Sequence, residues 1–500
     1  MNASPPPSGS VSAPPRRGWA VGTVALLVLV AAAQLGFLSR HSLRNNEFIT
    51  LRVLDLSYGE ILRERPSRNH MPGYFLALKA WTDVFGQSEA MLHLPSALVG
   101  LAGILLVWRL AVHLYGSRAG LLALALCGFN QIHAQMGADA RMYSSVFFGA
   151  ALATWAFLLY LDTGRARYVV GLAAAGVFTL GVQMLHAFVA LPMVGYALAR
   201  RRALRGRVAA PVAAALLPFL IWFPVMAYLA RVEDKIGPRH PWRPFFAGQA
   251  VRQVAIIFHG DTEYSGRAEQ GVGALLLTVC TVVVALPGRR WRRRGHYLGF
   301  LALLVLVPLV GIPLLGMRST KQMVNSWRYY VTAAAAAPLL LTAGYLLLWR
   351  SGRRRWAVAY AAASVLVVLA NLVAFLASPG TGVREIVRYI GARWQTGDVV
   401  ATSRAEARSR AFPYYGALEH LPRQPGEELE TPADLYAWLA EQCAGAKRLW
   451  LVFYSGGRKH SEMADAVRGH ADAFAPVGKR HAVGETAVQL YEVHLPPRQD

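Results

Sequence analysis

Apolar runs of about twenty residues recur along most of this chain, and they restrict its fold more than any other feature. Each run can cross the roughly 30 Å hydrocarbon core of a bilayer as one helix of about 20 residues. Backbone polar groups inside a bilayer must be satisfied within the protein, so spanning segments form helices or closed barrels. The runs are continuous and do not alternate with polar residues, which favours helices. With 55% hydrophobic and 16% charged residues, the sequence predicts an all-α polytopic membrane protein.

The basic residues gather in short linkers between the apolar runs. Short loops rich in Arg and Lys stay on the cytoplasmic side of a membrane. The formal net charge of +24 is therefore explained by topology, and nucleic acid is not expected as a partner. The arginine-containing linkers lie at 16–17, 118, 165–167, 200–207, 288–296 and 350–355.

Placing these linkers inside the cell predicts about eleven spans, with the N-terminus cytoplasmic and the C-terminal region outside. Residues 1–17 are rich in Pro and Ser and are expected to form a disordered cytoplasmic tail. No small-residue cleavage site follows the first run, so it is interpreted as a retained span. The predicted spans are 18–38, 91–114, 119–134, 144–162, 168–184, 187–199, 208–230, 270–287, 297–316, 330–349 and 356–377.

The outward segments are longer, mixed in charge and rich in aromatic residues. Residues 39–90 and 231–269 form two large outer loops within a membrane domain that extends over 18–380. In the first loop, residues 48–65 have a helical period that predicts one amphipathic helix lying in the membrane interface. Its expected apolar face consists of Leu51, Leu54, Tyr58, Ile61 and Leu62.

Hydrophobic character falls after residue 380, and 381–500 are expected to form a small extracytoplasmic α/β domain. The stretches "DVVATS" and "RLWLVFY" are typical of strands, and residues 474–494 suggest a final hairpin. Thr431 followed by Pro432 and Asp434 is typical of a helix N-terminus.

The turn "HAQMGADARMYSS" holds Asp139 and Arg141 between two apolar runs. An acid and a base at the edge of a bilayer are unfavourable unless they are hydrated or paired. From the residues alone, an ion pair that caps two helices and a functional site both remain open. The three cysteines are far apart, which indicates neither a disulfide framework nor a metal site.

Several stretches in order resemble a known family. They are "NNEFITL", "NHMPGYFLALKAWTDVFGQSEAMLHLPSALVGLAGI", "YGSRAGLLALAL" and "HAQMGADARMYSS", followed by the pair Arg328-Tyr329. Together, over roughly residues 18–380, they are similar to glycosyltransferases of the family 39 type. These are integral-membrane GT-C enzymes akin to protein O-mannosyltransferases and the aminoarabinose transferase of lipid A.

The resemblance implies a GT-C membrane glycosyltransferase at the outer membrane surface. It implies transfer of a sugar from a polyprenyl-phosphate donor to an acceptor hydroxyl, usually with inversion, and the acceptor is a glycan, a lipid or a protein. Arg outnumbers Lys, and Ala, Leu and Gly are abundant, which fits a GC-rich bacterial gene, so we expect the chain in a bacterial inner membrane. A transporter or flippase is the less favoured alternative, since it would carry charges within its spans and internal repeats.

The catalytic base is left open by a departure from the family pattern. Where relatives carry an Asp-Glu pair, this chain has Asn46-Glu47, and an amide cannot accept a proton. Glu47 is one option, although its side chain points about 100° away on a helix. Asp139 is the second option, and a catalytically impaired lipid-sugar-binding or assembly protein of the same fold is the third.

The resemblance also suggests ligand-binding residues. Cationic groups must stabilise the departing lipid phosphate. The resemblance identifies no definite cofactor, and a divalent cation at Asp139 is left open. The candidates for the donor phosphate are Arg141, Arg328 and Lys321, and those for other substrate contacts are His70, Tyr143, Trp242 and Tyr329.

Overall fold

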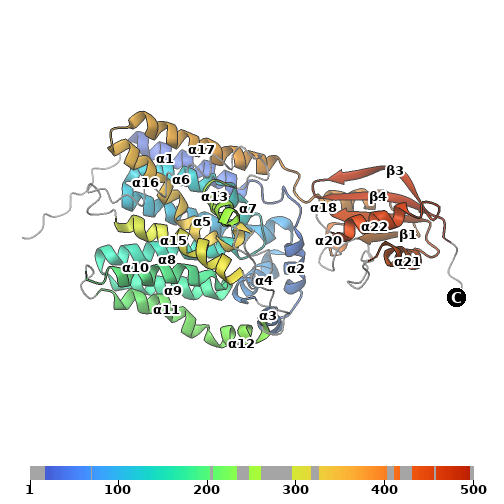
Figure 1. Cartoon of the computed structure of the whole chain (residues 1–500), viewed down its shortest axis with the longest axis horizontal. Coiled ribbons are helices and arrows are strands. Elements are labelled where there is room, and N and C mark those ends of the chain that lie inside the picture. The colour runs from blue at the N-terminus through green and yellow to red at the C-terminus, as the bar shows by residue number, and fades with distance from the viewer. Residues whose placement is uncertain are drawn as a thin grey trace, which may run out of the picture.

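A computed structural model of the protein consists of two parts arranged along its longest axis (Figure 1). One is a long bundle of helices, and the other is a smaller region of strands and helices built by the C-terminal residues. Three short helices lie at the end of the bundle that faces this region: α2 (Asn45–Leu54), α3 (Tyr58–Ser67) and α4 (Gly73–Phe85). The structure describes residues 17–68, 70–202, 207–233, 247–260, 296–316, 326–402, 410–416, 431–454 and 458–495.

Four helices in the described part of the bundle are long and apolar enough to cross a membrane, and six shorter apolar helices accompany them. The chain is therefore a multi-pass membrane protein. The long helices are α5 (Glu89–Tyr115), α8 (Tyr143–Thr163), α15 (His296–Gly316) and α17 (Arg354–Ala377). The shorter ones are α1 (Arg17–Leu35), α6 (Ser117–Gly128), α9 (Ala166–Val182), α10 (Ala187–Ala199), α11 (Ala209–Ile221) and α16 (Ala337–Arg350).

Short elements connect these helices, mostly at the end of the bundle near α2. They are α7 (Gln131–Gly137), η1 (Met184–His186), α12 (Phe223–Glu233), α13 (Ala247–His259), η4 (Trp327–Tyr329) and η5 (Val331–Ala335). The α8–α9 and α16–α17 connections, which carry arginines, lie at the opposite end of the bundle (Figure 1).

Several predicted spans differ from the observed helices in their boundaries. The span 187–199 coincides with α10, whereas 119–134 ends early, at Gly128. The Asn130 side chain accepts a hydrogen bond from the Ile132 amide and starts α7 as a separate helix. The span 208–230 is divided into α11 and α12, and 330–349 begins with the 3₁₀ turn η5 before α16 starts at Ala337. Because 270–287 lies outside the described residues, the number of eleven spans stays a prediction.

The prediction of one interfacial helix over 48–65 is wrong, because the chain forms α2 and α3 with a break between them. The Ser57 side chain accepts a hydrogen bond from the Glu60 amide at the start of α3. The Glu60 carboxylate accepts one from the Ser57 amide, which completes a capping box. The break changes the helical phase. Tyr58 and Leu62 are therefore exposed, although both were expected on the apolar face with Ile61.

Small residues let the bundle helices approach closely, as is common in membranes. A Cβ atom added at Gly103 of α5 would lie 2.5 Å from the ring of Phe147 on α8. A Cβ atom added at Gly149 of α8 would lie 1.9 Å from Oγ1 of Thr179 on α9. These contacts leave no room for a methyl group at either glycine.

The C-terminal region contains a four-stranded sheet with the order β1-β2-β4-β3. β1 and β2 are parallel, and the other pairs are antiparallel, so the predicted strands and the final hairpin are confirmed. Thr431 caps α21 as its sequence indicates. The elements are α18 (Val383–Gly391), β1 (Asp398–Thr402), α20 (Ala411–Tyr415), α21 (Pro432–Gln442), β2 (Arg448–Tyr454), α22 (Arg458–Arg468), β3 (Phe474–Val483) and β4 (Thr486–Val493).

We expect Gly103→Ala to lower the stability of the bundle by about 1–3 kcal/mol, because the added methyl group overlaps the buried Phe147 ring. Gly195→Ala is the matched control, since nothing lies within 4 Å of a Cβ atom there. Thermal unfolding in detergent measures both. Equal melting temperatures for the two variants would contradict the close packing of α5 on α8.

Candidate active site at one end of the bundle

The turn between α7 and α8 is held by two side chains of α2. The Ala140 amide donates a hydrogen bond to Oε1 of Glu47 at 2.8 Å. The Thr50 hydroxyl donates to the Ala140 carbonyl at 3.2 Å. The turn itself is tight, because the Arg141 amide donates to the Asp139 carbonyl at 2.7 Å. α2 therefore fixes the position of Asp139 and Arg141, which the sequence singled out.

Glu47 forms a buried ion pair with His93 of α5. Nε2 of His93 lies 2.7 Å from Oε1 of Glu47, and each side chain is about 1% exposed. Nδ1 of His93 lies 2.5 Å from the Leu38 carbonyl. Both ring nitrogens face acceptors, so only the imidazolium donates at both. The Arg44 amide donates to Oε2 of Glu47 at 2.8 Å, so both carboxylate oxygens are bound by donors.

These donors determine the protonation of Glu47. Burial by itself would raise the pKa of Glu47, but the His93 charge and the hydrogen bonds from His93, Ala140 and Arg44 outweigh it. The pKa is therefore held below its usual range, and Glu47 stays ionised. Because both Glu47 oxygens already accept hydrogen bonds, this carboxylate holds the turn in place and is poorly placed to take a proton from a substrate.

Asp139 has the opposite environment. It is 1% exposed, and neither carboxylate oxygen has a hydrogen-bond partner among the described residues. Nη2 of Arg328 lies 3.9 Å from Oδ2, too far for a hydrogen bond. Arg44 and Arg141 also interact electrostatically with this carboxylate. A buried carboxylate among guanidinium groups, with both oxygens free, is able to accept a proton from a ligand.

The pKa of Asp139 is raised, first by burial and second by the negative charge of Glu47. The nearby arginines act in the other direction but do not cancel these effects. A general base works best when its pKa approaches the working pH. The two carboxylates of this site therefore have pKa values shifted in opposite directions by their environments.

A divalent cation does not fit at Asp139. Arg328, Arg44 and Arg141 surround the carboxylate, and a bound cation would meet their positive charges at close range. Within the described ranges, no group of three or more His, Cys, Asp or Glu side chains is arranged to hold a metal. The arrangement is one that favours an anionic ligand.

Arg141 and Arg65 both contact the ring of Phe75. Their guanidinium carbons lie 5.9 Å and 4.9 Å from the ring centroid, within cation–π range. Arg141 is 6% exposed, and its Nε has no partner in the part of the chain that the structure describes. His70 is 6.2 Å from the same ring, edge to face. Burial and then the charges of Arg141 and Arg65 lower the pKa of His70 to about 4, so it is neutral at pH 7.

Arg328 approaches the site from η4. Its guanidinium carbon lies 5.5 Å from the Tyr143 ring centroid and 5.9 Å from that of Trp327. Tyr143 and Trp327 contact each other edge to face at 6.0 Å. Tyr329 is half-buried beside them, and burial, followed by Tyr143, raises its pKa. Residues far apart in sequence thus build one wall of the site.

Arg44 is the third arginine near Asp139, with Arg141 and Arg328, and the sequence did not single it out. The Gln135 amide orients its oxygen toward Arg44, 2.7 Å from Nη1 and 3.1 Å from Nη2. In this orientation the amide nitrogen of Gln135 lies 2.7 Å from the Gln131 side chain, one helical turn away. The Arg44 side chain is therefore held beside the turn that carries Asp139.

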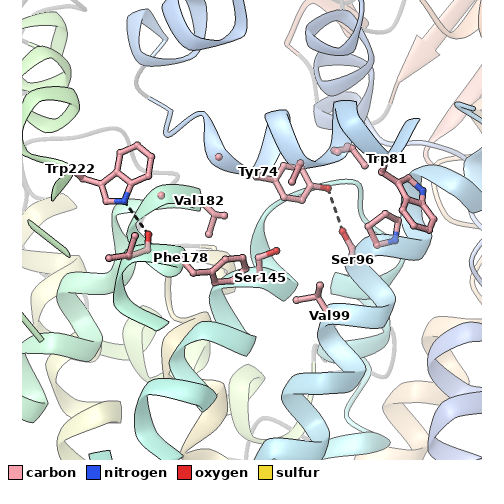
Figure 2. A pocket seen from close by; sticks show the side chains of 14 residues that line it. Tyr74, Trp81, Ser96, Val99, Ser145, Phe178, Val182 and Trp222 are labelled. Carbon is pink, nitrogen blue, oxygen red and sulfur yellow. Dashed lines mark hydrogen bonds between the residues drawn. The ribbon is translucent and has the colours of Figure 1, made fainter. Parts of the chain in front are cut away.

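An apolar cavity of about 420 Å³ adjoins the site between α4, α5, α8 and α9. Figure 2 shows Val99, Phe178 and Val182 around it, with Tyr74 and Ser96 facing each other across its rim. The Tyr74 and Ser96 hydroxyls are 3.3 Å apart. Ser96, which lines the cavity, donates a hydrogen bond from its hydroxyl to the Arg141 carbonyl at 3.4 Å, so one lining residue contacts the backbone of the turn that carries Asp139.

The structure gathers most of the residues expected from the sequence at one place. Asp139, Arg141, Arg328, His70, Tyr143 and Tyr329 meet around the turn, with Glu47 behind it. Asn46 is half-buried, and its side-chain amide makes no hydrogen bond to any described residue. Trp242 and Lys321 lie outside the described residues.

Three participants were missed: His93, Arg44 and Arg65. His93 had a usable signal, because an ionisable residue at the start of an apolar run needs a partner. Arg44 and Arg65 had none, because residues 39–90 contain several arginines and only the fold brings these two beside the turn.

Comparison with known proteins agrees with this architecture. Residues 69–228 match the family model for dolichyl-phosphate-mannose-protein mannosyltransferase. The structure of ArnT from Cupriavidus metallidurans bound to undecaprenyl phosphate superposes with a TM-score of 0.55 at 15% identity, over 96% of this chain and 99% of that one. The chain has the GT-C fold. The apo form of the same ArnT gives a TM-score of 0.56 at 16% identity, over 96% and 100% of the two chains.

The GT-C fold extends to a more distant structure. The oligosaccharyltransferase from Archaeoglobus fulgidus, in a complex with Zn and sulfate, has a TM-score of 0.50 at 12% identity, over 85% of this chain and 67% of that one. No curated protein sequence matches this GT-C chain significantly.

We expect Glu47→Gln to destabilise this GT-C chain by about 3–5 kcal/mol at pH 7, because it leaves the His93 imidazolium buried without its partner. Since the folded-state pKa of Glu47 is lowered, its stabilisation is complete above the unfolded-state pKa of about 4.3. It is lost as the pH falls through the lower folded-state value. Melting temperatures of wild type and variant, measured from pH 7 to pH 3, should therefore converge at acid pH.

The exposed Glu60 provides the control, and Glu60→Gln should melt close to wild type. A Glu47→Gln deficit that is the same at pH 3 and pH 7 would contradict the ionised state of Glu47.

Proposed function

We propose that this chain is a membrane glycosyltransferase that moves a sugar from a polyprenyl-phosphate donor to an acceptor hydroxyl, with inversion. The observation that carries the proposal is Asp139: a buried carboxylate with two free oxygens among arginines, beside an apolar cavity. The GT-C fold and the match to a mannosyltransferase family model support the class of reaction. The undecaprenyl phosphate bound to ArnT supports a lipid-linked donor.

In the proposed step, the acceptor oxygen attacks the anomeric carbon of the sugar. A bond forms between that carbon and the acceptor oxygen, while the bond from carbon to the phosphate oxygen breaks. The phosphate oxygen keeps the electron pair, and polyprenyl phosphate leaves. Asp139 takes the acceptor proton as general base. Glu47 holds the turn that carries Asp139 and does not itself touch the substrate.

The arginines match the charge that develops in this step. The donor is a phosphodiester with one negative charge, and the leaving phosphate monoester approaches two. Arg65 is already paired with Glu64 at 2.5 Å. Arg141, Arg44 and Arg328 remain to meet the phosphate, against the single carboxylate of Asp139. Charges that are better satisfied in the transition state than in the ground state accelerate the step.

The apolar cavity suits the first isoprene units of the donor. Its lining is almost entirely apolar. At its rim the Tyr74 hydroxyl contacts that of Ser96, which bonds to the Arg141 carbonyl. A polyprenyl chain that enters there would bring its phosphate to the arginines. Lipid-linked substrates reach a site from within the bilayer, which explains a binding site at the end of a membrane bundle.

We propose that the site lies on the outer face of a bacterial inner membrane. The arginine-rich α8–α9 and α16–α17 connections lie at the other end of the bundle, which the positive-inside rule assigns to the cytoplasm. The C-terminal region then lies outside, where it assists recognition of a glycan, lipid or protein acceptor.

One observation keeps a second function in consideration. Asn46 occupies the position where relatives carry an acid, and its amide makes no hydrogen bond to a described residue. A chain that binds the lipid-sugar without transferring it would keep the arginines and the cavity while lacking a working base.

Release of free polyprenyl phosphate in proteoliposomes, given a panel of polyprenyl-phosphate sugars and membrane acceptors, tests the function. We expect turnover by the wild type. Asp139→Asn should lower kcat about 10²–10⁴-fold, because the general base is lost. Donor binding should be retained. Asp83→Asn, a change at an exposed carboxylate of α4, is the control and should leave turnover unchanged.

If the wild type binds donors but turns over none of them, the transferase proposal is contradicted and the lipid-sugar-binding protein is supported. Wild-type turnover that Asp139→Asn leaves intact would remove Asp139 as the base.

We expect Val99→Trp to weaken binding of long-chain donors at least tenfold, because the indole fills the cavity that Val99 lines. Leu98→Trp is the matched control, since Leu98 is 45% exposed on the same helix and does not line the cavity. A donor analogue with a methyl group in place of the polyprenyl chain should bind both variants like wild type. Equal loss for the polyprenyl donor and the methyl analogue would mean that the cavity does not hold the lipid.

A further inference from the structure

The C-terminal region reaches the catalytic helix α2 through the short helix α20. The Tyr415 hydroxyl at the end of α20 accepts a hydrogen bond from the Leu43 amide at 2.6 Å. The same hydroxyl donates to the Glu89 carboxylate at the start of α5. One side chain of the C-terminal region thus joins the entry of α2 to the entry of α5. Those two helices carry Glu47 and His93.

Phe48 provides a second contact at the same place. It is fully buried, directly follows Glu47, and its ring lies 6.2 Å from Tyr415 and 6.4 Å from Tyr414, edge to face in both cases. The α20 tyrosines therefore cover the face of α2 next to the Glu47 carboxylate.

The chain before α2 is held by the C-terminal region as well. Arg384 donates to the Ser39 carbonyl at 2.9 Å and to the Arg40 carbonyl at 3.0 Å, and it also pairs with Glu89. The Ser42 hydroxyl accepts from the Val383 amide at 3.1 Å. Backbone groups across 39–43 are thus bound by residues that lie more than 300 positions later.

The contacts form a continuous path to the reacting carboxylate. Tyr415 holds the Leu43 amide, and the next amide, that of Arg44, donates to Glu47. Glu47 holds the Ala140 amide, next to Asp139. Leu43, Phe48 and Glu47 are all buried in close packing. A displacement of α20 would therefore also displace the turn that carries Asp139.

We propose that α20 is a clamp by which the C-terminal region sets the position of the catalytic turn, with Tyr415 as a positioning residue for transfer. The inference rests on the proposed function and assigns to the C-terminal region a part in the chemical step in addition to acceptor recognition. Displacements of about 1 Å at a reacting group can cost on the order of 10²-fold in rate.

Tyr415→Phe tests the clamp, and Tyr414→Phe is the matched control. Both variants keep a ring against Phe48. Among the described residues, the Tyr414 hydroxyl donates to the Gln87 carbonyl at 2.8 Å, which is not part of the path. We expect Tyr415→Phe to lower kcat about tenfold or more, with the KM for the donor within about twofold of wild type. Tyr414→Phe should retain wild-type kcat at a similar melting temperature.

Hydrogen exchange of the full-length protein in detergent provides a readout that needs no turnover. Peptides covering 43–54 should exchange faster in Tyr415→Phe and at the wild-type rate in Tyr414→Phe. Wild-type exchange and kcat in Tyr415→Phe would overturn the clamp, as would equal effects of both variants. Faster exchange in Tyr415→Phe, with no turnover even in the wild type, would support the clamp while overturning the proposed function.

Discussion

The buried ion pair between Glu47 and His93 is the interaction on which the site depends. It joins α2 to α5 at the end of the bundle that faces the C-terminal region, and the same Glu47 oxygen binds the Ala140 amide. Loss of either partner would leave a charge buried without compensation, which is far more costly than breaking an exposed pair. The turn with Asp139 and Arg141 is therefore held rigidly, because breaking the Glu47–His93 pair that supports it costs a large free energy.

Two carboxylates close to each other take different roles because their surroundings differ. Glu47 is bound by three donors and stays ionised. Asp139 is equally buried but has no bound donor among the described residues, and its pKa is raised. Pairs of titratable groups with pKa values shifted apart are typical of acid–base sites. In the proposed transfer, the arginines around Asp139 provide the positive charge that a departing phosphate requires.

The sequence predicted much of this arrangement and misjudged some of it. Apolar runs and arginine linkers predicted the membrane bundle, and local propensity predicted the strands and the cap at Thr431. The order of the family-like motifs predicted Asp139 and Arg141 as candidate site residues. The single helix over 48–65 was wrong, since Ser57 and Glu60 start a new helix where the periodicity alone suggested continuity. Glu47 was weighed as a base, and its bonds to His93 and Ala140 were not foreseeable.

The sequence by itself determined the class of the protein, because hydrophobic length and charge placement act locally and can be read along the chain. It also determined which residue types were available for chemistry. Only the tertiary structure decided their roles. Whether a carboxylate is a support or a base depends on donors contributed by other helices, such as His93 for Glu47. The clamp from Tyr415 to Leu43 joins residues 372 positions apart. Contacts of that kind follow from packing, and no local pattern in the sequence encodes them.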